Sequence, residues 1–228
     1  MAEVCGIHAG DGYLRMRRGK GEIDISGHLE EKKYYDMHVV PSFNSVFSLN
    51  LKAREFSKGT YGFVIYNKKI AESFSQLGFP VGKKSLSVKI PLQILESKNF
   101  ILYARFLRDL FDTDGHIGFR KRYGKYILFK IKKHHYPIIH ITTISKLLME
   151  NICFMLNELE IKHFVYCYSP KKFHENAYYR VIISRRNRID EWMRMIGSKN
   201  FVKFSRFLIW NKFGFCPTNT SLKKEKIF

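Results

Sequence analysis

Two Asp-Gly pairs, Asp11-Gly12 and Asp114-Gly115, lie 103 residues apart, and each follows an apolar stripe that is typical of a helix. A carboxylate at the end of a helix is unfavourable, because the helix dipole places partial negative charge there. A divalent cation is a natural compensating partner. The pairs therefore predict metal-binding carboxylates, with solvated Asp-Gly turns as the commoner alternative. A D-x-D calcium loop is excluded, because Tyr123 stands where its closing glutamate is required.

The second aspartate lies between a predicted helix and a predicted strand. Apolar residues over 106–111 recur at spacings of three and four, which predicts one buried helical stripe. We expect Gly115 to end this helix in the left-handed conformation. Residues 116–122 then alternate in the manner of a strand.

The N-terminus repeats this pattern. Aligning the two aspartates also aligns Gly10 with Thr113 and Gly6 with Asp109. Gly6 and Gly10 are four residues apart, so they lie on one face of the predicted helix. Two residues without side chains at a spacing of four allow another helix backbone to approach closely. Two such helices would bring Asp11 and Asp114 together.

The segments VCGIHAGDG and LRDLFDTDG resemble the two motif copies of the LAGLIDADG homing endonucleases in their single-chain form. The second copy departs from the motif at Asp109, where the family usually has a small residue. The resemblance covers nearly the whole chain, and it implies a saddle-shaped DNA-binding β-surface.

Charge and composition agree with a nucleic-acid partner. The chain has 228 residues, 45% of them hydrophobic, and its 40 Lys and Arg against 20 Asp and Glu give a net charge of +20. The basic residues interleave with aromatic residues on strand-like segments, which favours nucleic acid over a membrane surface. The four cysteines show no zinc-binding spacing. We expect an intracellular protein without a membrane span.

The periodicity predicts an α+β protein with an internal repeat. The first half reads as a helix, a β-ribbon over 13–28, a helix over 29–47 with a break at Pro41, strands over 49–56 and 61–66, and a helix over 68–77. A basic connector follows, over 79–97. Helices over 99–113, 145–160 and 188–196 and strands over 117–143, 164–168 and 178–184 repeat this order, and a further helix covers 201–210.

Each half therefore reads as αββαββα, and the two halves are expected to be pseudo-symmetric. Ile70, Phe74, Leu77 and Gly78 match Ile189, Met193, Ile196 and Gly197 at a constant offset of 119. We predict an N-terminal half over 1–97 and a C-terminal half over 98–228.

Antiparallel ribbons fit the major groove of DNA, and ten residues of strand span about ten base pairs. Two unequal halves predict an asymmetric double-stranded DNA site of about twenty base pairs, bound by a monomer. The predicted DNA-binding residues are Arg15, Arg17, Arg120, Arg122, Lys130, Lys132 and Arg186.

The chemistry that the resemblance implies is metal-dependent cleavage of both DNA strands. Asp11 and Asp114 would bind Mg²⁺, and the resemblance adds the backbone carbonyls of Gly10 and Thr113 as further ligands. Metal ions would activate a water molecule and stabilise the leaving oxygen. We expect Lys68 to be an additional catalytic basic residue, with Asn187 in the matching place of the second half.

Two alternative functions share this fold and charge. An intron RNA maturase would bind intron RNA and would not need both aspartates. A non-cleaving DNA-binding regulator is the other alternative, and Asp109 is the one residue that favours it. The presence of both Asp11 and Asp114 favours the nuclease.

Overall fold

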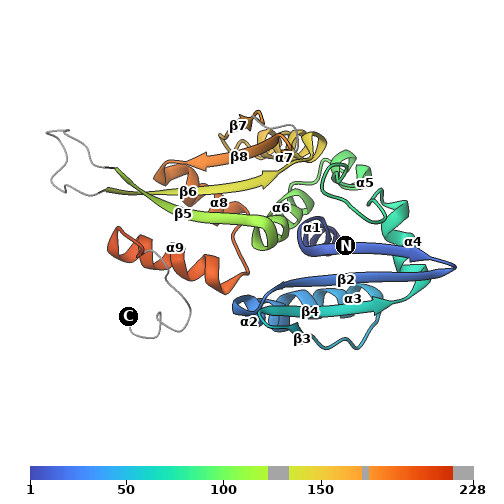
Figure 1. Ribbon diagram of the computed structural model, residues 1–228. Coiled ribbons are helices and arrows are strands. Elements are labelled where there is room, and N and C mark those ends of the chain that lie inside the picture. The colour runs from blue at the N-terminus through green and yellow to red at the C-terminus, as the bar shows by residue number, and fades with distance from the viewer. Residues whose placement is uncertain (123–133, 171–174, 218–228) are drawn as a thin grey trace, which may run out of the picture.

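The structure is a computed structural model, and residues 1–122, 134–170 and 175–217 are described (Figure 1). It is an α+β structure with two four-stranded antiparallel sheets of the same topology, in the orders β1-β2-β4-β3 and β5-β6-β8-β7. The strands are β1 (Gly12–Arg17), β2 (Lys20–His28), β3 (Arg54–Ser57), β4 (Thr60–Tyr66), β5 (Gly115–Arg122), β6 (His134–Thr143), β7 (Phe164–Tyr168) and β8 (Tyr178–Ser184).

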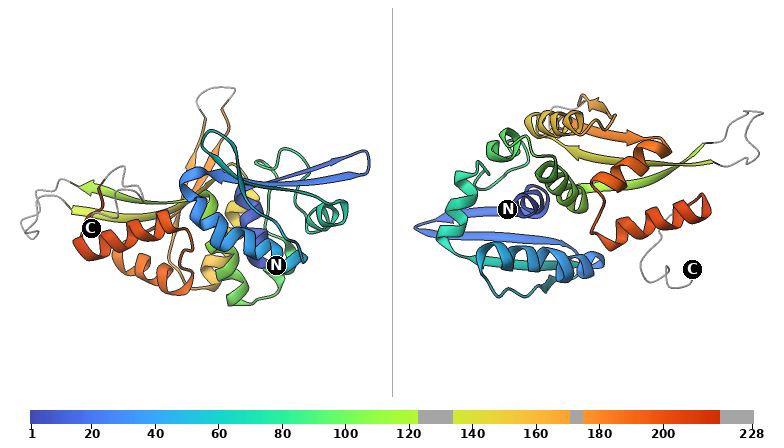
Figure 2. Two further views of the ribbon diagram at one scale, coloured as in Figure 1. Left: turned by 90° about the horizontal axis from the view of Figure 1, so that it is seen from below. Right: turned by 180° about the vertical axis from the view of Figure 1, so that it is seen from behind.

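The helices lie on one side of the two sheets and leave the other side open (Figure 2). In the first half they are α1 (Ala2–Asp11), η1 (Leu29–Glu31), α2 (Lys32–Tyr34), η2 (Tyr35–Val39), α3 (Val40–Phe47) and α4 (Lys68–Gln76). In the second half they are α6 (Phe100–Asp114), α7 (Lys146–Glu158), α8 (Arg186–Met195) and α9 (Phe201–Phe213), and α5 (Leu92–Glu96) lies in the connecting segment. The predicted αββαββα order of each half is confirmed. The boundary at 97/98 stays a prediction.

Helices α1 and α6 pack side by side at the centre of the molecule, between the two sheets (Figure 1). Their contact depends on small residues in α1. A Cβ atom at Gly6 would lie 2.5 Å from the carbonyl oxygen of Phe106, and one at Gly10 would lie 2.0 Å from Thr113 Oγ1. The apolar residues of both helices, among them Val4, Ile7, Leu107 and Leu110, are fully buried. The predicted close approach of the two helices is confirmed.

Strand pairing places alternate residues on the open side. In the first sheet Tyr13 pairs with Asp24, and Arg15 pairs with Glu22. The residues between them, such as Leu14 and Ile23, are buried against the helices. In the second sheet His116 pairs with His140, and their neighbours on both strands face the core.

Gly115 does not end α6 in the left-handed conformation, so that prediction is wrong. Its φ and ψ are −79° and 163°, and those of Gly12 are −83° and 148°, which is extended backbone at both positions. The helix continues directly into a strand. Glycine is needed there for space, because a Cβ atom at Gly115 would lie 2.2 Å from Phe111 Cδ2 and one at Gly12 would lie 2.2 Å from His8 Nδ1.

Two elements of the first half differ from the sequence prediction. The strand predicted over 49–56 covers only 54–57, because the side chain of Asn44 binds both backbone groups of Leu51 and holds that segment against α3. The helical segment does not break at Pro41, which lies in the first turn of α3 directly after the π-helical segment η2. Proline clashes with the carbonyl four residues before it in a regular helix, and a π-turn changes that pairing.

Within residues 1–122, 134–170 and 175–217, no helix is both long and apolar enough to cross a bilayer.

Candidate active site

The two aspartates end the two central helices, and the helix pair brings them to one place on the open side of the molecule. Burial raises the pKa of Asp11 to about 7. A hydrogen bond from the hydroxyl of Tyr35 to Asp11 Oδ2, at 2.6 Å, opposes this shift, and the charge of Asp114 adds to it. The two carboxylates are therefore close enough to repel each other, as the motif alignment predicts.

Asp114 reaches solvent at the floor of the open side, and burial within the surrounding protein still raises its pKa. The charges of Lys84 and Lys203 lower that pKa and so oppose the effect of burial. Two like charges with incomplete solvation favour a cation between them. Carboxylate and carbonyl oxygens are the donors that Mg²⁺ prefers, so these residues fit a divalent ion of that kind.

Two buried lysines bind the ends of the central helices. Lys84 Nζ donates to the carbonyl oxygens of His8 at 2.6 Å and Gly10 at 2.5 Å. Lys203 Nζ donates to those of Phe111 and Asp112 at 2.7 Å each, and to that of Thr113 at 3.0 Å. His8 and Gly10 match Phe111 and Thr113 at the same offset of 103 as the aspartates. The two halves therefore carry the same arrangement of one aspartate and one lysine.

Burial lowers the pKa of both lysines, and that of Lys84 falls to about 8. The charges of Asp114 and Asp11 oppose this lowering of the pKa at Lys84. At Lys203 the charges of Glu31 and Asp112 oppose it most strongly. An ammonium group with a lowered pKa releases its proton more readily than an exposed lysine does.

The carbonyls predicted as further metal ligands, those of Gly10 and Thr113, are the groups that accept hydrogen bonds from these lysines. A carbonyl oxygen has two lone pairs, so each one can serve a lysine and a cation together. The structure brings both carbonyls to the two aspartates.

Lys68 does not lie at this site. It is exposed at the start of α4, and its ammonium group is 3.5 Å from Glu72. A Cβ atom at Gly21 would lie 2.9 Å from Lys68 Cα, whereas one at Gly27 would lie 2.9 Å from Asp11 Oδ2. These two glycines are six positions apart along β2, which is about 20 Å. The assignment of Lys68 as a catalytic residue is therefore corrected, and Asn187, at the matching start of α8, shares its place in the fold.

A signal for the two lysines at the helix ends, Lys84 and Lys203, is present in the sequence. Gly78 and Gly197 end equivalent helices at an offset of 119, and Lys84 and Lys203 follow them at the same offset. Extending the repeat past the glycines would have paired the two lysines. Their contact with the helix ends depends on the path of the following segment, which residue periodicity does not show.

Further polar residues fix α9 against the end of α6. Asp112 is fully buried, and it accepts hydrogen bonds from Ser198 Oγ at 2.5 Å and from the backbone N–H of Lys199 at 2.6 Å. Burial raises the pKa of Asp112 to about 7, and Lys203 opposes this. Asn200 Nδ2 donates to Glu31 Oε1 at 2.6 Å and to the carbonyl oxygen of Asp112 at 2.8 Å. Lys203 is thus held in place by the segment that precedes it.

Asp109 lies in a buried ion-pair network between the helices. His38 Nε2 is 2.6 Å from Asp109 Oδ1, the hydroxyl of Tyr34 donates to the same oxygen at 3.3 Å, and Arg108 bridges Asp109 and Glu3. Although Glu3, His38 and Asp109 could geometrically surround a metal ion, the guanidinium of Arg108 already supplies the positive charge. Asp109 therefore fits opposite Gly6 although the motif usually has a small residue there, because its carboxylate is bound by His38, Tyr34 and Arg108.

The predicted DNA-binding residues fall into three groups. Arg15 and Arg17 lie on the open side of the first sheet, and Arg120 is exposed on β5. Arg122 belongs to β5, and its side chain lies outside the described residues, as do Lys130 and Lys132 entirely. Arg186 instead starts α8, where it lies 5.4 Å from the ring of Trp210 and donates to Asn211, both on α9. It is not on a strand.

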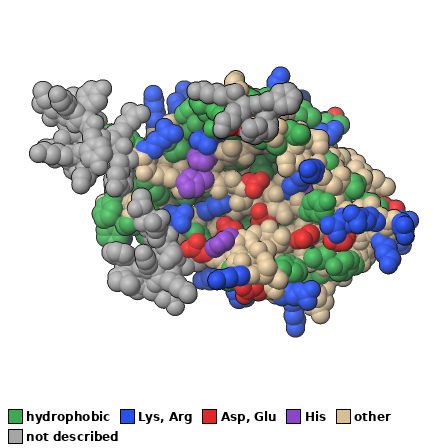
Figure 3. Space-filling view, in the orientation of Figure 1, with side chains coloured by type: hydrophobic (Ala, Val, Ile, Leu, Met, Phe, Trp, Pro, Cys, Tyr) green, Lys and Arg blue, Asp and Glu red, His purple; other side chains and the backbone are tan. Residues whose placement is uncertain are grey.

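The open side combines these charges. Figure 3 shows acidic side chains near its centre, with Lys and Arg side chains around them and toward the edges. A polyanion could contact the basic edges while two carboxylates face its middle.

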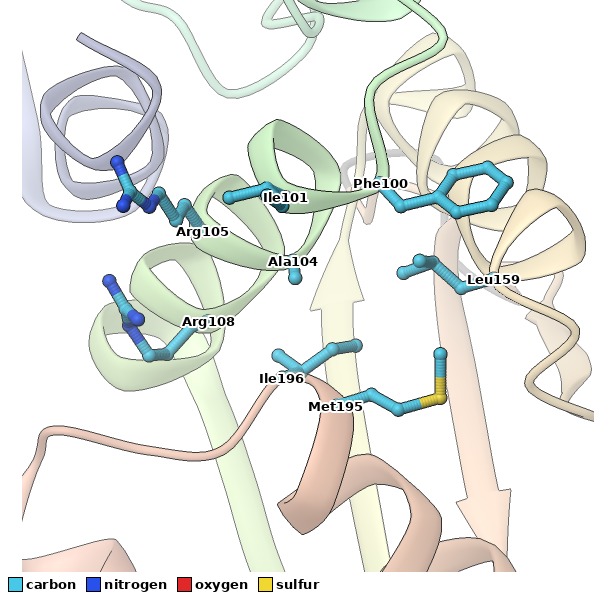
Figure 4. A pocket seen from close by; sticks show the side chains of 8 residues that line it. All are labelled: Phe100, Ile101, Ala104, Arg105, Arg108, Leu159, Met195 and Ile196. Carbon is cyan, nitrogen blue, oxygen red and sulfur yellow. The ribbon is translucent and has the colours of Figure 1, made fainter.

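An apolar pocket of about 340 Å³ lies at the other end of α6. Figure 4 shows Phe100, Ile101, Ala104, Leu159, Met195 and Ile196 around it, together with two arginines. Along α6 the pocket extends from Phe100, about 20 Å from Asp114, to Arg108, about 9 Å from it. It contributes no carboxylate, and we separate it from the candidate active site.

Comparisons with known proteins point to one family. Residues 102–197 match the family model described as LAGLIDADG-like domain. A structure of mesophilic variants of the homing endonuclease I-DmoI is similar to the chain, with a TM-score of 0.56, 17% identity and coverage of 86% of this chain and 93% of that chain. A structure of I-DmoI in complex with its target DNA in the presence of Mn is also similar. Its TM-score is 0.55, its sequence identity is 18%, and the match covers 86% of this chain and 92% of that chain.

The meganuclease I-SmaMI bound to uncleaveable DNA is also similar, with a TM-score of 0.61, 10% identity and coverage of 93% of this chain and 89% of that chain. No curated protein sequence matches the chain. These identities show a shared fold.

Proposed function

Because the chain belongs to the LAGLIDADG homing endonuclease family, we propose that it is a site-specific DNA endonuclease that cuts both strands with the help of a divalent ion, Mg²⁺ in the cell. The observation that carries this proposal is the pair of aspartates at the centre of the open, basic side. The neighbours I-DmoI and I-SmaMI are homing endonucleases or meganucleases with DNA-bound structures, and one was studied with Mn.

Asp11 and Asp114 would hold the ion or ions through their carboxylates, with the carbonyls of Gly10 and Thr113 beside them. A divalent ion supplies a bound water of lowered pKa and stabilises the oxygen that leaves. Tyr35 orients the Asp11 carboxylate through its hydroxyl. A bound cation would relieve the repulsion between the two acids and favour their charged forms.

Lys84 and Lys203 would each serve one DNA strand. The charges of both ammonium groups act on Asp114, and that of Lys203 also acts on Asp11, so positive charge favours a phosphate at this place. Lys84, with its pKa of about 8, can also accept or donate a proton near neutral pH. One aspartate and one lysine per half give each strand a similar set of groups.

The two sheets would bind DNA on both sides of this centre. Each open sheet face presents strands long enough for about half of a site of roughly twenty base pairs. The side chains on the two faces differ, with Arg15 and Glu22 on the first where Gly118 and Ile138 stand on the second. We therefore propose an asymmetric target, bound by one chain whose two halves replace a dimer.

A selection from a randomised double-stranded DNA pool tests this function. The wild-type protein with Mg²⁺ should yield a defined set of cleaved sequences, and omitting the ion should abolish cleavage. Asp11→Asn and Asp114→Asn should each reduce cleavage at least 100-fold, on the order expected for loss of a metal ligand or charge-stabilising group. Both should still bind the selected DNA, because neither residue carries positive charge.

Cleavage at a normal rate by either variant would contradict the site assignment. Sequence-specific binding without cleavage at any divalent-ion concentration would favour the DNA-binding regulator. If the wild type neither binds nor cuts DNA and instead promotes splicing of an intron RNA, the maturase is the correct alternative.

A further inference from the structure

The first sheet holds one arginine in a fixed orientation on its open face. Arg15 Nη1 lies 3.3 Å from both carboxylate oxygens of Glu22, its partner across the strand pair. The guanidinium carbon of Arg15 lies 5.4 Å from the centre of the Tyr13 ring on the same strand. The side chain of Arg15 remains 42% exposed, so its other donors are free to meet a ligand.

Contact with a phosphate does not require this arrangement. A carboxylate beside the arginine repels the DNA backbone and reduces the attraction that a phosphate contact uses. Base edges in the major groove present acceptors and amines rather than anions, so an acid is tolerated there. Asp24 lies next to Tyr13 across the same strand pair and adds a second negative charge to this part of the face. The local chemistry therefore fits the groove floor.

A planar guanidinium matches the two acceptors O6 and N7 of guanine, and Arg to guanine is the commonest specific contact in protein–DNA complexes. The carboxylate of Glu22 limits the rotation of Arg15, and the ring of Tyr13 limits its tilt. Preorganisation of this kind lowers the entropy that binding costs.

The second half has no arginine at the position equivalent to Arg15. The alignment of the two motifs places Gly118 at the position of Arg15, and Ile138 pairs with Gly118 where Glu22 pairs with Arg15. A Cβ atom at Gly118 would lie 2.9 Å from His116 Nε2, so the histidine ring covers this position. Among the described strand residues, the pairing of an arginine with a carboxylate is thus a feature of β1 and β2, whereas Arg180 on β8 donates to the uncharged Thr142 and lies 5.6 Å from the centre of the Tyr178 ring.

We propose that Arg15, oriented by Glu22 and Tyr13, reads a guanine in the half of the DNA target that the first sheet contacts. This inference rests on the proposed function and adds a base and a position to it. Arg15 lies four residues after Asp11 on an extended strand, which is about 13 Å or four base-pair steps. The guanine should stand about four base pairs from the centre of the cleavage site.

The test compares variants of the full chain by selection from a randomised DNA pool in the inactive Asp11→Asn background. The protein with Arg15 should select guanine at one position about four base pairs from the centre, in one half-site, by roughly tenfold or more over other bases. Arg15→Lys keeps the charge and loses the paired donors, so it should lose this preference at that position alone. Glu22→Gln should weaken the same preference.

Two matched controls make the same chemical changes elsewhere. Glu55→Gln is the control for Glu22→Gln, and Glu55 lies on β3, on the side of the sheet that faces the helices. Arg194→Lys is the control for Arg15→Lys, and Arg194 lies on α8. Both residues are exposed, and neither change should alter base preference. Thermal unfolding of each variant shows that the fold is kept.

Two results would overturn the inference and leave the proposed function standing: selected sites with no guanine in that window, or an Arg15→Lys variant that keeps the full preference. Cleavage of the pool by the active wild type is measured in parallel. If it yields no cleaved sequence, the proposed function itself fails, and the guanine assignment falls with it.

Discussion

The carboxylates of Asp11 and Asp114 lie near two ammonium groups, yet within residues 1–122, 134–170 and 175–217 neither forms an ion pair with a lysine. Lys84 and Lys203 donate instead to backbone carbonyls at the helix ends. The lysines therefore lower the electrostatic cost of two adjacent acids through space and leave the carboxylate oxygens available. A direct ion pair would place the lysine where a divalent ion has to bind.

This arrangement makes stability depend on pH. The pKa of Asp11 is about 7 in the folded protein and 3.8 as its ordinary value, so the folded state holds the proton more tightly. Stability should therefore fall as pH rises from about 4 to 7 and stay reduced above that range. In the absence of divalent ions, Asp11→Asn should raise the free energy of unfolding at pH 8 by about 1–3 kcal/mol and change it little at pH 4.5.

Chemical denaturation at the two pH values measures this effect. Asp190→Asn is the matched control, because Asp190 is exposed and its contact with Arg186 is 3.8 Å, so its effect should stay below about 0.5 kcal/mol. Mg²⁺ should stabilise the wild type at pH 8 more than the Asp11→Asn variant. An Asp11→Asn variant that is less stable than the wild type at pH 8 would contradict the raised pKa.

At the scale of elements, the central helix pair depends on an unequal pair of residues at its crossing. Gly10 in α1 faces Thr113 in α6, and Thr113 Oγ1 donates back to the carbonyl of Asp109 within its own helix. Glycine is unfavourable in a helix by about 1 kcal/mol relative to alanine. Its presence one residue before Asp11 is explained by the space that Thr113 occupies.

Gly10→Ala should therefore destabilise the fold even though alanine is the better helix former. The new Cβ atom would lie 2.0 Å from Thr113 Oγ1 and 2.6 Å from Thr113 Cβ, and overpacking of this kind costs about 1–3 kcal/mol. Thr113→Gly removes both atoms, so the double variant should recover stability relative to Gly10→Ala. A double-mutant cycle from denaturant unfolding measures the coupling, and additive effects would show that the two residues do not share this space.

Most of the helices and strands could be predicted from the sequence, because the periodicity that indicates them is local. The motif pair predicts the two central helices and both aspartates, and Gly78 ends α4 with a φ of 90°, as helix-stop chemistry predicts. The strand before Ser57 is shorter than predicted, because Asn44 captures Leu51 through a tertiary contact. Lys84 and Lys203 were missed for a similar reason: Lys84 lies in an irregular segment and Lys203 in the first turn of α9, and only the fold brings both to the helix ends.

At the scale of the whole molecule, a net charge of +20 is distributed around an acidic centre. Self-repulsion of such a charge weakens the compact state, and an anionic partner relieves it. The open side places Arg120 on β5 in the row that also holds His116, two residues after Asp114. Burial lowers the pKa of His140 to about 4 and also lowers that of His116, so both rings are neutral at pH 7. Arginine and lysine therefore supply the positive charge of this row.

DNA affinity should accordingly fall steeply with salt. Each neutralised phosphate releases close to one counterion, so the logarithm of the binding constant should decrease linearly with the logarithm of salt concentration. If Arg120 contacts a phosphate, Arg120→Gln should reduce the magnitude of that slope by about one. Arg194→Gln removes the same charge from α8, on the helical side, and should leave the slope unchanged. Fluorescence anisotropy with the selected DNA, Asp11→Asn protein and no divalent ion measures the slopes; equal decreases for both variants would mean that net charge, rather than the open side, binds the backbone.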